Sequence, residues 1–367
     1  MNKMEIEEEL KSLREKIETV DGRMLRLLNE RAEIALEVGK VKTEGKKDLY
    51  DPQREGQVLE GLTLKNAGPF PQGALQTVFR EIISACRSLE VGLTVAYLGP
   101  AASYTHLASI KHFGSSVHAL SRESLQEVFE AVETRKVGYG VVPIENSIEG
   151  AVDRTLDLLA ESKLMICGEV LLRISHDLLS RTGKPEDVQE IYSHPQALGQ
   201  CRKWLTKNFP HTSLTETAST AKAAEIAAGD RKVAAIASSS AAEQYALKVI
   251  ERRIENDPHN YTRFLILGQE NRKRTGRDKT SILFSTPHTP GALCQVLKVF
   301  SERGINLTKI ESRPMKGMPW EYVFFVDFEG HSADKHIDEA MIGLKRNALF
   351  MKFLGSYPRD SSGAVDG

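Results

Sequence analysis

The spacing of apolar residues sets the start of the chain apart from the rest. Between Glu5 and Lys42 apolar residues recur three or four positions apart without a proline, which predicts one long amphipathic helix. Asp51-Pro52 suits the start of a second helix that ends before Gly68-Pro69, and a third pattern runs from about Ala74 to Leu89. Helices of such unequal length cannot enclose their own apolar stripe. We therefore expect this segment to dimerise through the long helix.

The middle of the chain alternates short β-branched runs with helical ones. This alternation is typical of an α/β domain with a largely parallel sheet. The expected strands are Thr94–Leu98, Val137–Ile144, Leu164–Leu172, Val233–Ala237 and Phe264–Leu267.

The charged stretch Gln269–Lys279 has no periodic apolar residues and is expected to be a linker. After it the pattern predicts a βαββαβ unit of ferredoxin-like type. Its elements are expected at Thr280–Ser285, Pro290–Arg303, Ile305–Glu311, Tyr322–Phe328, His336–Arg346 and Phe350–Tyr357. The domains that we expect are therefore 1–91 (all-α), 92–270 (α/β) and 279–358 (ferredoxin-like).

Composition excludes several classes of function. The chain has 49 Lys and Arg against 50 Asp and Glu, so it lacks the basic excess that binds nucleic acid. No stretch approaches the roughly 20 apolar residues of a membrane span, and the charged start is unlike a signal peptide, so we expect a cytoplasmic protein with no membrane partner. The cysteines are scattered and no GxGxxG or HExxH motif occurs, so we expect no metal and no cofactor.

Charged residues on the first two predicted helices suit the binding of a small dianion. Any one of them alone is most simply part of a solvated helix face, but the set is more informative. Arg31 and Lys42 are eleven residues apart and share a face of the helix, whereas Arg14 lies roughly 100° away. Arg14 therefore suits the site of a neighbouring subunit better than its own.

These helices resemble the all-helical chorismate mutase family over about residues 5 to 90. The resemblance is carried by Leu13-Arg14-Glu15-Lys16-Ile17, Asn29-Glu30-Arg31, Glu37-Val38-Gly39-Lys40-Val41-Lys42 and Asp51-Pro52-Gln53-Arg54-Glu55. It implies an intertwined dimer in which Arg14, Arg31 and Arg54 bind carboxylates and Lys42 meets the ether oxygen of chorismate.

The same resemblance places Asp51 and Glu55 on the hydroxyl side of the substrate. Where the best-known bacterial pattern has Ser and Gln near the end of the third helix, this chain has Cys86 and Glu90. A glutamate donates a hydrogen bond only when it is protonated, so Glu90 predicts a mutase whose activity declines above the acidic range.

Five small-polar motifs follow at predicted strand ends in the middle of the chain. Each alone would be a helix cap or a turn. In this order they resemble prephenate dehydratase over about residues 93 to 270, which implies two α/β lobes built like a periplasmic binding protein with substrate in the cleft. The motifs are Gly99-Pro100-Ala101-Ala102-Ser103-Tyr104-Thr105, Pro143-Ile144-Glu145-Asn146-Ser147, Ser193-His194-Pro195-Gln196, Ala218-Ser219-Thr220-Ala221 and Tyr261-Thr262-Arg263-Phe264.

The resemblance implies that Thr262 is the catalytic proton donor or relay, because prephenate must lose its ring hydroxyl. Arg263 is expected either to anchor a substrate carboxylate or to be a structural ion-pair partner. His194 precedes Pro195 and is either a general acid or a hydrogen-bonded turn residue. The remaining residues expected to bind the substrate are Ser103, Asn146, Ser147, Ser219, Thr220 and Phe264.

The βαββαβ unit resembles the ACT regulatory domain of phenylalanine-sensitive dehydratases over about residues 280 to 357. Gly291-Ala292-Leu293 and Glu311-Ser312-Arg313-Pro314 carry the likeness. It implies domains that pair side by side and bind phenylalanine at the interface through Gly291, Ala292, Leu293, Asn306, Leu307, Glu311 and Ser312. A purely structural appendage is the alternative, because a fold alone does not imply a function.

The three resemblances together predict a bifunctional enzyme of phenylalanine biosynthesis that acts as a homodimer or a higher homo-oligomer. It would rearrange chorismate to prephenate, convert prephenate to phenylpyruvate, and be inhibited by phenylalanine. Arogenate dehydratase activity and a non-catalytic small-molecule binding protein are the alternatives.

Overall fold

The computed structural model describes residues 3–45, 50–90, 92–314 and 322–360, apart from the side chains of Thr43 and Glu90. The described residues form two compact units. The first unit contains Met1–Leu93 together with Phe113–His118, and the second contains Thr94–His112 and Ala119–Gly367. No described helix is long and apolar enough to cross a membrane.

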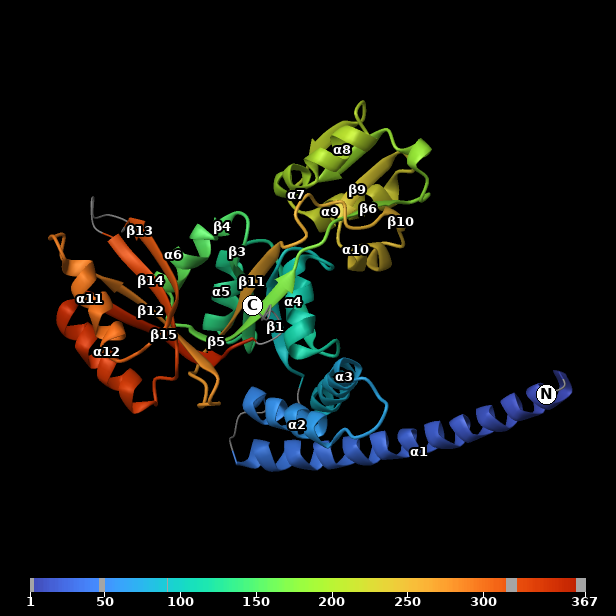
Figure 1. Cartoon of the computed structure of the whole chain (residues 1–367), viewed down its shortest axis with the longest axis horizontal. Coiled ribbons are helices and arrows are strands. Elements are labelled where there is room, and N and C mark those ends of the chain that lie inside the picture. The colour runs from blue at the N-terminus through green and yellow to red at the C-terminus, as the bar shows by residue number, and fades with distance from the viewer. Residues whose placement is uncertain (1–2, 46–49, 91, 315–321, 361–367) are drawn as a thin grey trace. The chain divides into compact units, whose positions relative to one another are not determined.

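The first unit is built from helices α1 (Lys3–Glu44), α2 (Pro52–Lys65) and α3 (Gln72–Glu90), which confirms the expected helical segments. The carboxylate of Asp51 accepts a hydrogen bond from the Arg54 backbone N–H at 3.0 Å and so caps α2, whose first residue is Pro52. Helix α1 extends far beyond α2 and α3, which lie against its C-terminal half (Figure 1).

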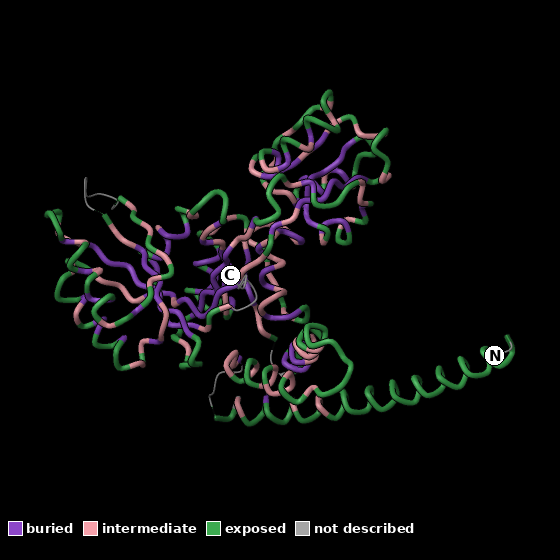
Figure 2. Tube along the Cα trace, in the orientation of Figure 1, coloured by how far each residue is buried: buried purple, intermediate pink, exposed green. Residues whose placement is uncertain are grey.

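The first two-thirds of α1 are exposed to solvent along their whole length, from Lys3 to Glu30 (Figure 2). This stretch carries an apolar row that a soluble helix normally buries. The exposed side chains include Leu10, Leu13, Ile17, Val20, Met24 and Leu27.

The second unit contains three sheets among its described strands. The first sheet has the order β2-β1-β3-β11-β5, with β4 paired to β3. Its strands are β1 (Thr94–Leu98), β2 (His118–Arg122), β3 (Tyr139–Asn146), β4 (Gly150–Ala151), β5 (Met165–Arg173) and β11 (Tyr261–Gly268). Helices α4 (Tyr104–Phe113), α5 (Leu125–Glu133) and α6 (Asp153–Glu161) connect or follow them.

The second sheet forms a separate lobe with the strand order β10-β6-β9-β7-β8. Its strands are β6 (Asp177–Ser180), β7 (Glu190–Ser193), β8 (Ser213–Glu216), β9 (Val233–Ala237) and β10 (Lys248–Glu251). Its helices are η1 (Pro185–Asp187), α7 (Pro195–Gln200), α8 (Arg202–Asn208), α9 (Thr220–Gly229) and α10 (Ser239–Gln244). The two lobes confirm the expected architecture.

The expectation of a largely parallel sheet is wrong, because both sheets are mixed. Strand β11 runs antiparallel to both of its neighbours, β3 and β5, and β6 runs antiparallel to β9 and β10. The reason lies in the chain path. Strand β5 leads into the second lobe and β11 leads back out of it, so these two connecting strands necessarily point in opposite directions.

The third sheet, of order β13-β14-β12-β15, confirms the βαββαβ unit. Its elements are β12 (Asp278–Ser285), α11 (Ala292–Ser301), β13 (Leu307–Pro314), β14 (Tyr322–Glu329), α12 (Lys335–Asn347) and β15 (Phe350–Pro358). Helices α11 and α12 lie together on one face of this sheet (Figure 1). Ile282 and Phe284 of β12 pack toward this helix-covered core.

The opposite face of the third sheet shares a core with the first lobe. Leu283, which alternates with Ile282 and Phe284, belongs to the same apolar cluster as Phe325, Val142 and Leu265. Of the predicted linker Gln269–Lys279, residues 269–277 contain no strand or helix, but Asp278 and Lys279 belong to β12, so its predicted end is wrong. The segment does not separate two independent bodies, because the apolar cluster continues across it.

Close approach between β15 and β5 depends on Gly355. A Cβ built at this position would lie 2.3 Å from the backbone oxygen of Ile166, and the residue has φ +146°. Backbone atoms on both sides cannot yield as a flexible side chain can. Glycine is therefore required here by space and by backbone conformation together.

We expect Gly355→Ala to lower the free energy of unfolding of the second unit by about 1–3 kcal/mol, as overpacking does in a tight interior. The measurement is thermal unfolding of the full chain. Gly199→Ala is the matched control, because nothing lies within 4 Å of a Cβ there and its φ is not in the positive range. Equal melting temperatures for the two variants would contradict the packing argument.

Candidate functional site

A cavity of about 350 Å³ in the helical unit gathers most of the charged residues that the sequence singled out. Arg31 and Lys42 from α1 meet residues from the start of α2 and from α3. The predicted residues that line it are Arg31, Lys42, Asp51, Arg54, Glu55 and Cys86. The side chain of Glu90 lies outside the described residues, so its role stays a prediction.

Arg87 lines the same cavity, and sequence reasoning missed it. Its Nη1 lies 2.5 Å from Glu55 Oε1, its Nη2 donates to the backbone oxygen of Phe113, and its guanidinium lies 4.8 Å from the Tyr50 ring centre. Burial raises the pKa of Glu55 above its ordinary value, while the Arg87 guanidinium opposes that shift. Arg87 thus holds Glu55 in place.

Arg14 does not line the cavity of its own chain. It precedes Arg31 by seventeen residues on one continuous helix, which amounts to about 26 Å at 1.5 Å per residue. An arginine side chain does not span that distance. If Arg14 serves a site of this type, that site belongs to another copy of the chain.

A larger cavity of about 680 Å³ lies between the two lobes of the second unit. It is called the cleft below. Segments from both sheets and from the lobe crossings contribute to its walls. The predicted residues that line it are Ser103, Asn146, His194, Ser219, Thr220, Thr262 and Phe264.

Thr262 and Asn146 form the best-defined polar pair in the cleft. Asn146 Nδ2 donates to Thr262 Oγ1 at 2.8 Å and to Asn260 Oδ1 at 2.7 Å. Its Oδ1 accepts from the backbone N–H groups of Ile148 and Glu149, at 3.0 and 3.1 Å, which fixes the orientation of the amide. Because Thr262 Oγ1 accepts from Asn146, its own hydrogen remains free to point into the cleft.

The hydrogen bonds continue from Asn146 across the cleft wall to residues that the sequence did not reveal. Asn260 Nδ2 donates to Gln200 Oε1 at 2.8 Å, and His176 Nε2 lies 2.9 Å from the same oxygen. Gln200 Nε2 is buried and has no partner among the described residues. Gln200 lines the cleft, but this nitrogen is enclosed in the wall and remains an unused buried donor.

Burial favours the neutral forms of His176 and Tyr104, which lie beside this series of hydrogen bonds. Burial lowers the pKa of His176, and because Gln200 Oε1 can only accept, the imidazole proton is assigned to Nε2. Burial also raises the pKa of Tyr104, whose hydroxyl donates to the Ser175 backbone oxygen at 2.5 Å. This part of the wall is therefore uncharged, while Arg122, Glu123, Lys222 and Glu225 place charged groups elsewhere in the cleft.

Arg263 does not face the cleft. Neighbouring side chains of a strand point to opposite faces, so Thr262 and Phe264 line the cleft while Arg263 points away from it. Its guanidinium pairs with Glu169 at 2.7 Å and with Asp327 at 2.5 Å. Of the two alternatives for Arg263, the structure favours the ion-pair partner over the carboxylate anchor. The cations that do line the cleft are Arg122 and Lys222.

Two further predicted residues have clear structural contacts. His194 caps α7, because its Nδ1 accepts from the Gln196 backbone N–H at 3.3 Å, and a catalytic role for it stays a prediction. Ser147 is not among the residues that line the cleft. Its hydroxyl donates to the His259 backbone oxygen and accepts from the Tyr261 N–H, so it braces the chain just before Thr262.

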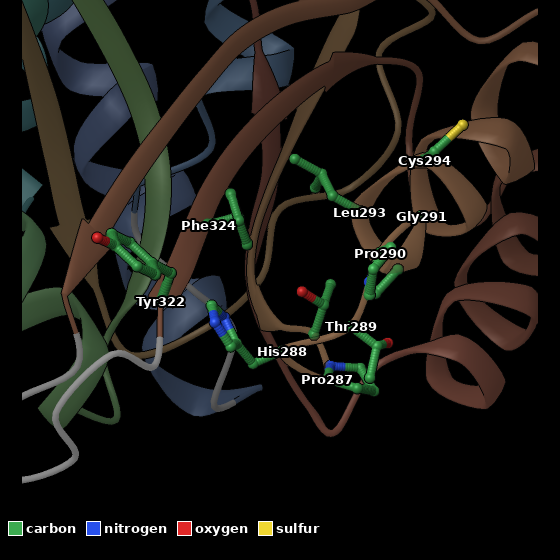
Figure 3. A pocket seen from close by; sticks show the side chains of 11 residues that line it. Pro287, His288, Thr289, Pro290, Gly291, Leu293, Cys294, Tyr322 and Phe324 are labelled. Carbon is green, nitrogen blue, oxygen red and sulfur yellow. The ribbon is translucent and has the colours of Figure 1, made fainter.

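A third cavity, of about 510 Å³, lies at the N-terminus of α11 and includes Gly291, Ala292 and Leu293 (Figure 3). Tyr322 and Phe324 of β14 form its other side. Gly291 has φ +82°, but a Cβ there would meet nothing within 4 Å. Backbone conformation rather than space therefore requires glycine at this position.

The other residues that were predicted to bind phenylalanine do not line this cavity. Asn306, Leu307, Glu311 and Ser312 lie on or next to β13, which is an edge strand of the third sheet. Ser312 pairs in register with Phe324, which lines the cavity, but none of the four residues is itself part of the lining.

Models of three known families match successive segments of the chain. Family models match the chain as chorismate mutase type II over residues 13–91, prephenate dehydratase over 95–272 and ACT domain over 280–345. Among solved structures, prephenate dehydratase of Arthrobacter aurescens in complex with L-Phe is 35% identical, with a TM-score of 0.68 over 73% of this chain and 90% of that one. A quorum quenching acylase, GqqA, is 28% identical, with a TM-score of 0.67 over 73% of this chain and 98% of that one.

The similarity to curated proteins extends over nearly the whole chain. The bifunctional chorismate mutase/prephenate dehydratase of Aquifex aeolicus (strain VF5) is 48% identical over 356 residues, which cover 96% of this chain and 98% of the relative. The chain therefore belongs to the family of bifunctional chorismate mutase/prephenate dehydratases.

Proposed function

We propose that the chain rearranges chorismate to prephenate in the helical cavity and converts prephenate to phenylpyruvate in the cleft, with feedback inhibition by phenylalanine. The observation that carries the proposal is the Asn146–Thr262 pair, which presents a polarised hydroxyl to the cleft. We retain 1–91, 92–270 and 279–358 as the domain limits and the cytoplasm as the location.

The helical cavity suits a reaction that needs no nucleophile. The rearrangement of chorismate is unimolecular, so catalysis consists of holding the reactive conformation and stabilising charge that develops in the transition state. Arg31 and Arg54 line the cavity at positions suited to carboxylates, and Lys42 supplies a cation for the ether oxygen. Asp51 and Glu55 are assigned to the hydroxyl side, with Glu55 held by Arg87.

We assign the completed mutase site to a dimer. A single chain presents Arg31, Lys42 and Arg54 in its cavity but keeps Arg14 about 26 Å along the helix. The exposed apolar row on the first part of α1 needs a covering surface, and a second copy of α1 supplies an equally apolar one. The same pairing brings an Arg14 to each cavity.

The cleft supports the loss of hydroxide and carbon dioxide from prephenate. Aromatisation of the ring drives this step, and the enzyme has to help the hydroxyl leave. Asn146 donates to Thr262 Oγ1 and thereby strengthens the Thr262 hydroxyl as a donor toward the leaving oxygen. We assign Arg122 and Lys222, which line the cleft, to the carboxylates of the substrate.

We assign phenylalanine to the cavity at the N-terminus of α11. A helix N-terminus attracts a carboxylate, and Phe324, Tyr322 and Leu293 offer apolar surface to an aromatic ring. Asn306, Leu307, Glu311 and Ser312 would then come from a second copy whose edge strand β13 pairs with this one. The L-Phe complex of the Arthrobacter aurescens dehydratase supports phenylalanine as the effector.

The direct test is to incubate the purified chain with chorismate alone and to follow phenylpyruvate by its ultraviolet absorbance. Formation of phenylpyruvate supports both activities. A binding protein would form none. Parallel assays with prephenate and arogenate at equal concentrations decide between the two dehydratase activities, which share the motifs in the cleft.

For the mutase, we expect Arg14→Ala and Arg31→Ala each to abolish conversion of chorismate while dehydratase activity persists. Mixing the two inactive variants should restore activity, because a mixed dimer contains one site with both arginines. Free exchange of subunits predicts about a quarter of the parent activity. No recovery from dimers shown by mass to be mixed would place Arg14 and Arg31 outside a shared site.

For the dehydratase, we expect Asn146→Asp to lower kcat on prephenate by about 100-fold, within the usual range for general acid catalysis. An ionised carboxylate accepts hydrogen bonds but cannot donate to Thr262. The control is Asn208→Asp, the same chemical change on α8, where the amide donates only to the Trp204 oxygen of its own helix. An Asn146→Asp enzyme with the parent kcat would remove Asn146 from the chemistry.

For regulation, we expect Gly291→Ala to raise the phenylalanine concentration for half-inhibition by at least about 5-fold. Alanine disfavours φ +82° and so shifts the first turn of α11 that borders the cavity. Gly304→Ala is the matched control, since Gly304 also has positive φ (+63°) but lies beyond the other end of α11. Equal inhibition curves for both variants would move the effector site elsewhere.

A further inference from the structure

Strand β11 has two functional faces. Thr262 and Phe264 line the cleft, and Arg263 between them points to the third sheet. The side chain of Arg263 is 5% exposed, so it is enclosed by the groups that it contacts. A shift of Arg263 along or across the strand therefore moves Thr262 by a similar amount, because the two residues share one peptide bond.

The groups around Arg263 come from both the dehydratase lobe and the regulatory sheet. Its Nε lies 2.7 Å from Glu169 of β5, and its Nη1 lies 3.0 Å from Glu145 of β3 and 2.5 Å from Asp327 of β14. Its Nη2 donates to the Tyr357 hydroxyl of β15 at 2.9 Å. The guanidinium is thus held by two lobe strands on one side and two regulatory strands on the other.

Two lysines of the regulatory sheet complete this group. Lys279 Nζ lies 2.8 Å from Glu169, and Lys309 pairs with Glu145. Three cations, Arg263, Lys279 and Lys309, therefore face three carboxylates, Glu145, Glu169 and Asp327. Lys309 also lies 3.7 Å from Glu311, which stands outside these six. Asp327 is fully buried, and Ser281 donates a hydrogen bond to it. We call these six charged residues the junction cluster.

Most of this cluster is buried, with Glu145 its most exposed member at 30%, and paired charges in such a place resist small displacements. Separating any one pair leaves an uncompensated charge in a medium of low dielectric constant, where water cannot replace the lost partner. Sliding the regulatory sheet against β11 would separate Asp327 from Arg263. The lobe carboxylates and the regulatory carboxylate would then compete for the position of one guanidinium.

We propose that Asp327 of the regulatory sheet is a positioning residue for the dehydratase reaction: through Arg263 it fixes strand β11 and with it Thr262, and this contact transmits the state of the regulatory domain to the cleft. The proposal rests on the roles given above to Thr262 and to phenylalanine. Asp327 does not touch the substrate. Its expected effect is on turnover, because the cleft walls that bind prephenate remain in place.

The junction cluster makes deletion of the regulatory domain a poor test of regulation. Removing the regulatory domain by ending the chain after Gln269 would expose the shared apolar core and leave Arg263, Glu145 and Glu169 without their regulatory partners. In such a truncated chain, the effect of losing regulation could not be distinguished from the effect of losing packing. Single side-chain changes in the full chain avoid this confusion.

The test is a double-mutant cycle in the full chain with Asp327→Asn, Arg263→Gln and the two combined. We expect Asp327→Asn to lower kcat on prephenate by about 10- to 100-fold, as a small misplacement of a catalytic group does, with KM changed less than about 3-fold. Because Asp327 acts through Arg263, the double variant should lose no more turnover than Arg263→Gln alone. Losses that multiply, or an unchanged kcat in Asp327→Asn, would overturn the proposal.

Two controls separate positioning from a general weakening of the domain contact. Lys352→Met removes hydrogen bonds from the regulatory domain to the backbone oxygens of Leu159, Ala160 and Ser162, which lie at the end of α6 and not on β11. We expect this variant to keep the parent kcat. Turnover of chorismate in each variant reports that the mutase remains intact. A fall in kcat for Lys352→Met equal to that for Asp327→Asn would refute a specific role for Asp327.

Tyr357→Phe keeps the proposal testable if the charge variants do not fold. It removes the hydroxyl that accepts from Arg263 and lies 2.6 Å from Ser281 Oγ, and we expect a several-fold lower kcat with unchanged KM. Phenylalanine titration of parent and Tyr357→Phe then addresses transmission, for which we expect weaker maximal inhibition with phenylalanine binding retained. Full inhibition of Tyr357→Phe at the parent concentration would contradict transmission. A parent enzyme that ignores phenylalanine would refute the regulation proposed above, and the kcat comparison would still decide the positioning role.

Discussion

The alternation of side chains along β11 is the constraint on which the second unit depends. One strand must present Thr262 to a solvated cleft and Arg263 to a buried junction. Its neighbours β3 and β5 meet both demands, because they supply Asn146 on the cleft side and Glu145 and Glu169 on the junction side. The position of Thr262 and the contact between the first lobe and the third sheet therefore depend on the same few residues of β3, β5 and β11.

The junction cluster contributes more to the relative position of the two domains than to the free energy of unfolding. Buried ion pairs lose about as much in desolvation as they gain in attraction, and well-packed apolar residues often serve stability as well or better. Removing one partner alone, however, costs about 3–5 kcal/mol. A cluster with this energy profile tolerates one arrangement of the two domains and opposes the others, which is what a precise position for Thr262 requires.

The two cavities to which the reactions are assigned differ in the groups that line them, and the two reactions differ in the groups that they require. The helical cavity is lined by cations and carboxylates, since an electrostatic reaction on a dianion asks for charges in fixed places. The cleft is lined by apolar residues and by hydroxyl, amide and imidazole groups, of which Thr262, Asn146, Asn260, Gln200 and His176 are connected by hydrogen bonds. Its charged lining residues are Arg122, Glu123, Lys222 and Glu225. That composition suits the departure of a hydroxyl group, for which an oriented donor matters more than net charge.

The amino-acid sequence by itself determined the three helices of the first unit, the βαββαβ unit and many of the residues that line the helical cavity and the cleft. Apolar periodicity located α1 and the βαββαβ unit, because a side-chain period is a local property of the backbone. Short motifs that resemble those of known families located Thr262, Asn146 and Gly291, because such a motif is also read from neighbouring residues. Tertiary structure alone decided which face of β11 Arg263 occupies, that the sheets are mixed, and that Gln200, Asn260 and Arg87 join the sites. Those facts depend on contacts between residues far apart in the chain, such as Arg263 with Asp327 or Asn260 with Gln200, and no local pattern records a partner 60 residues away.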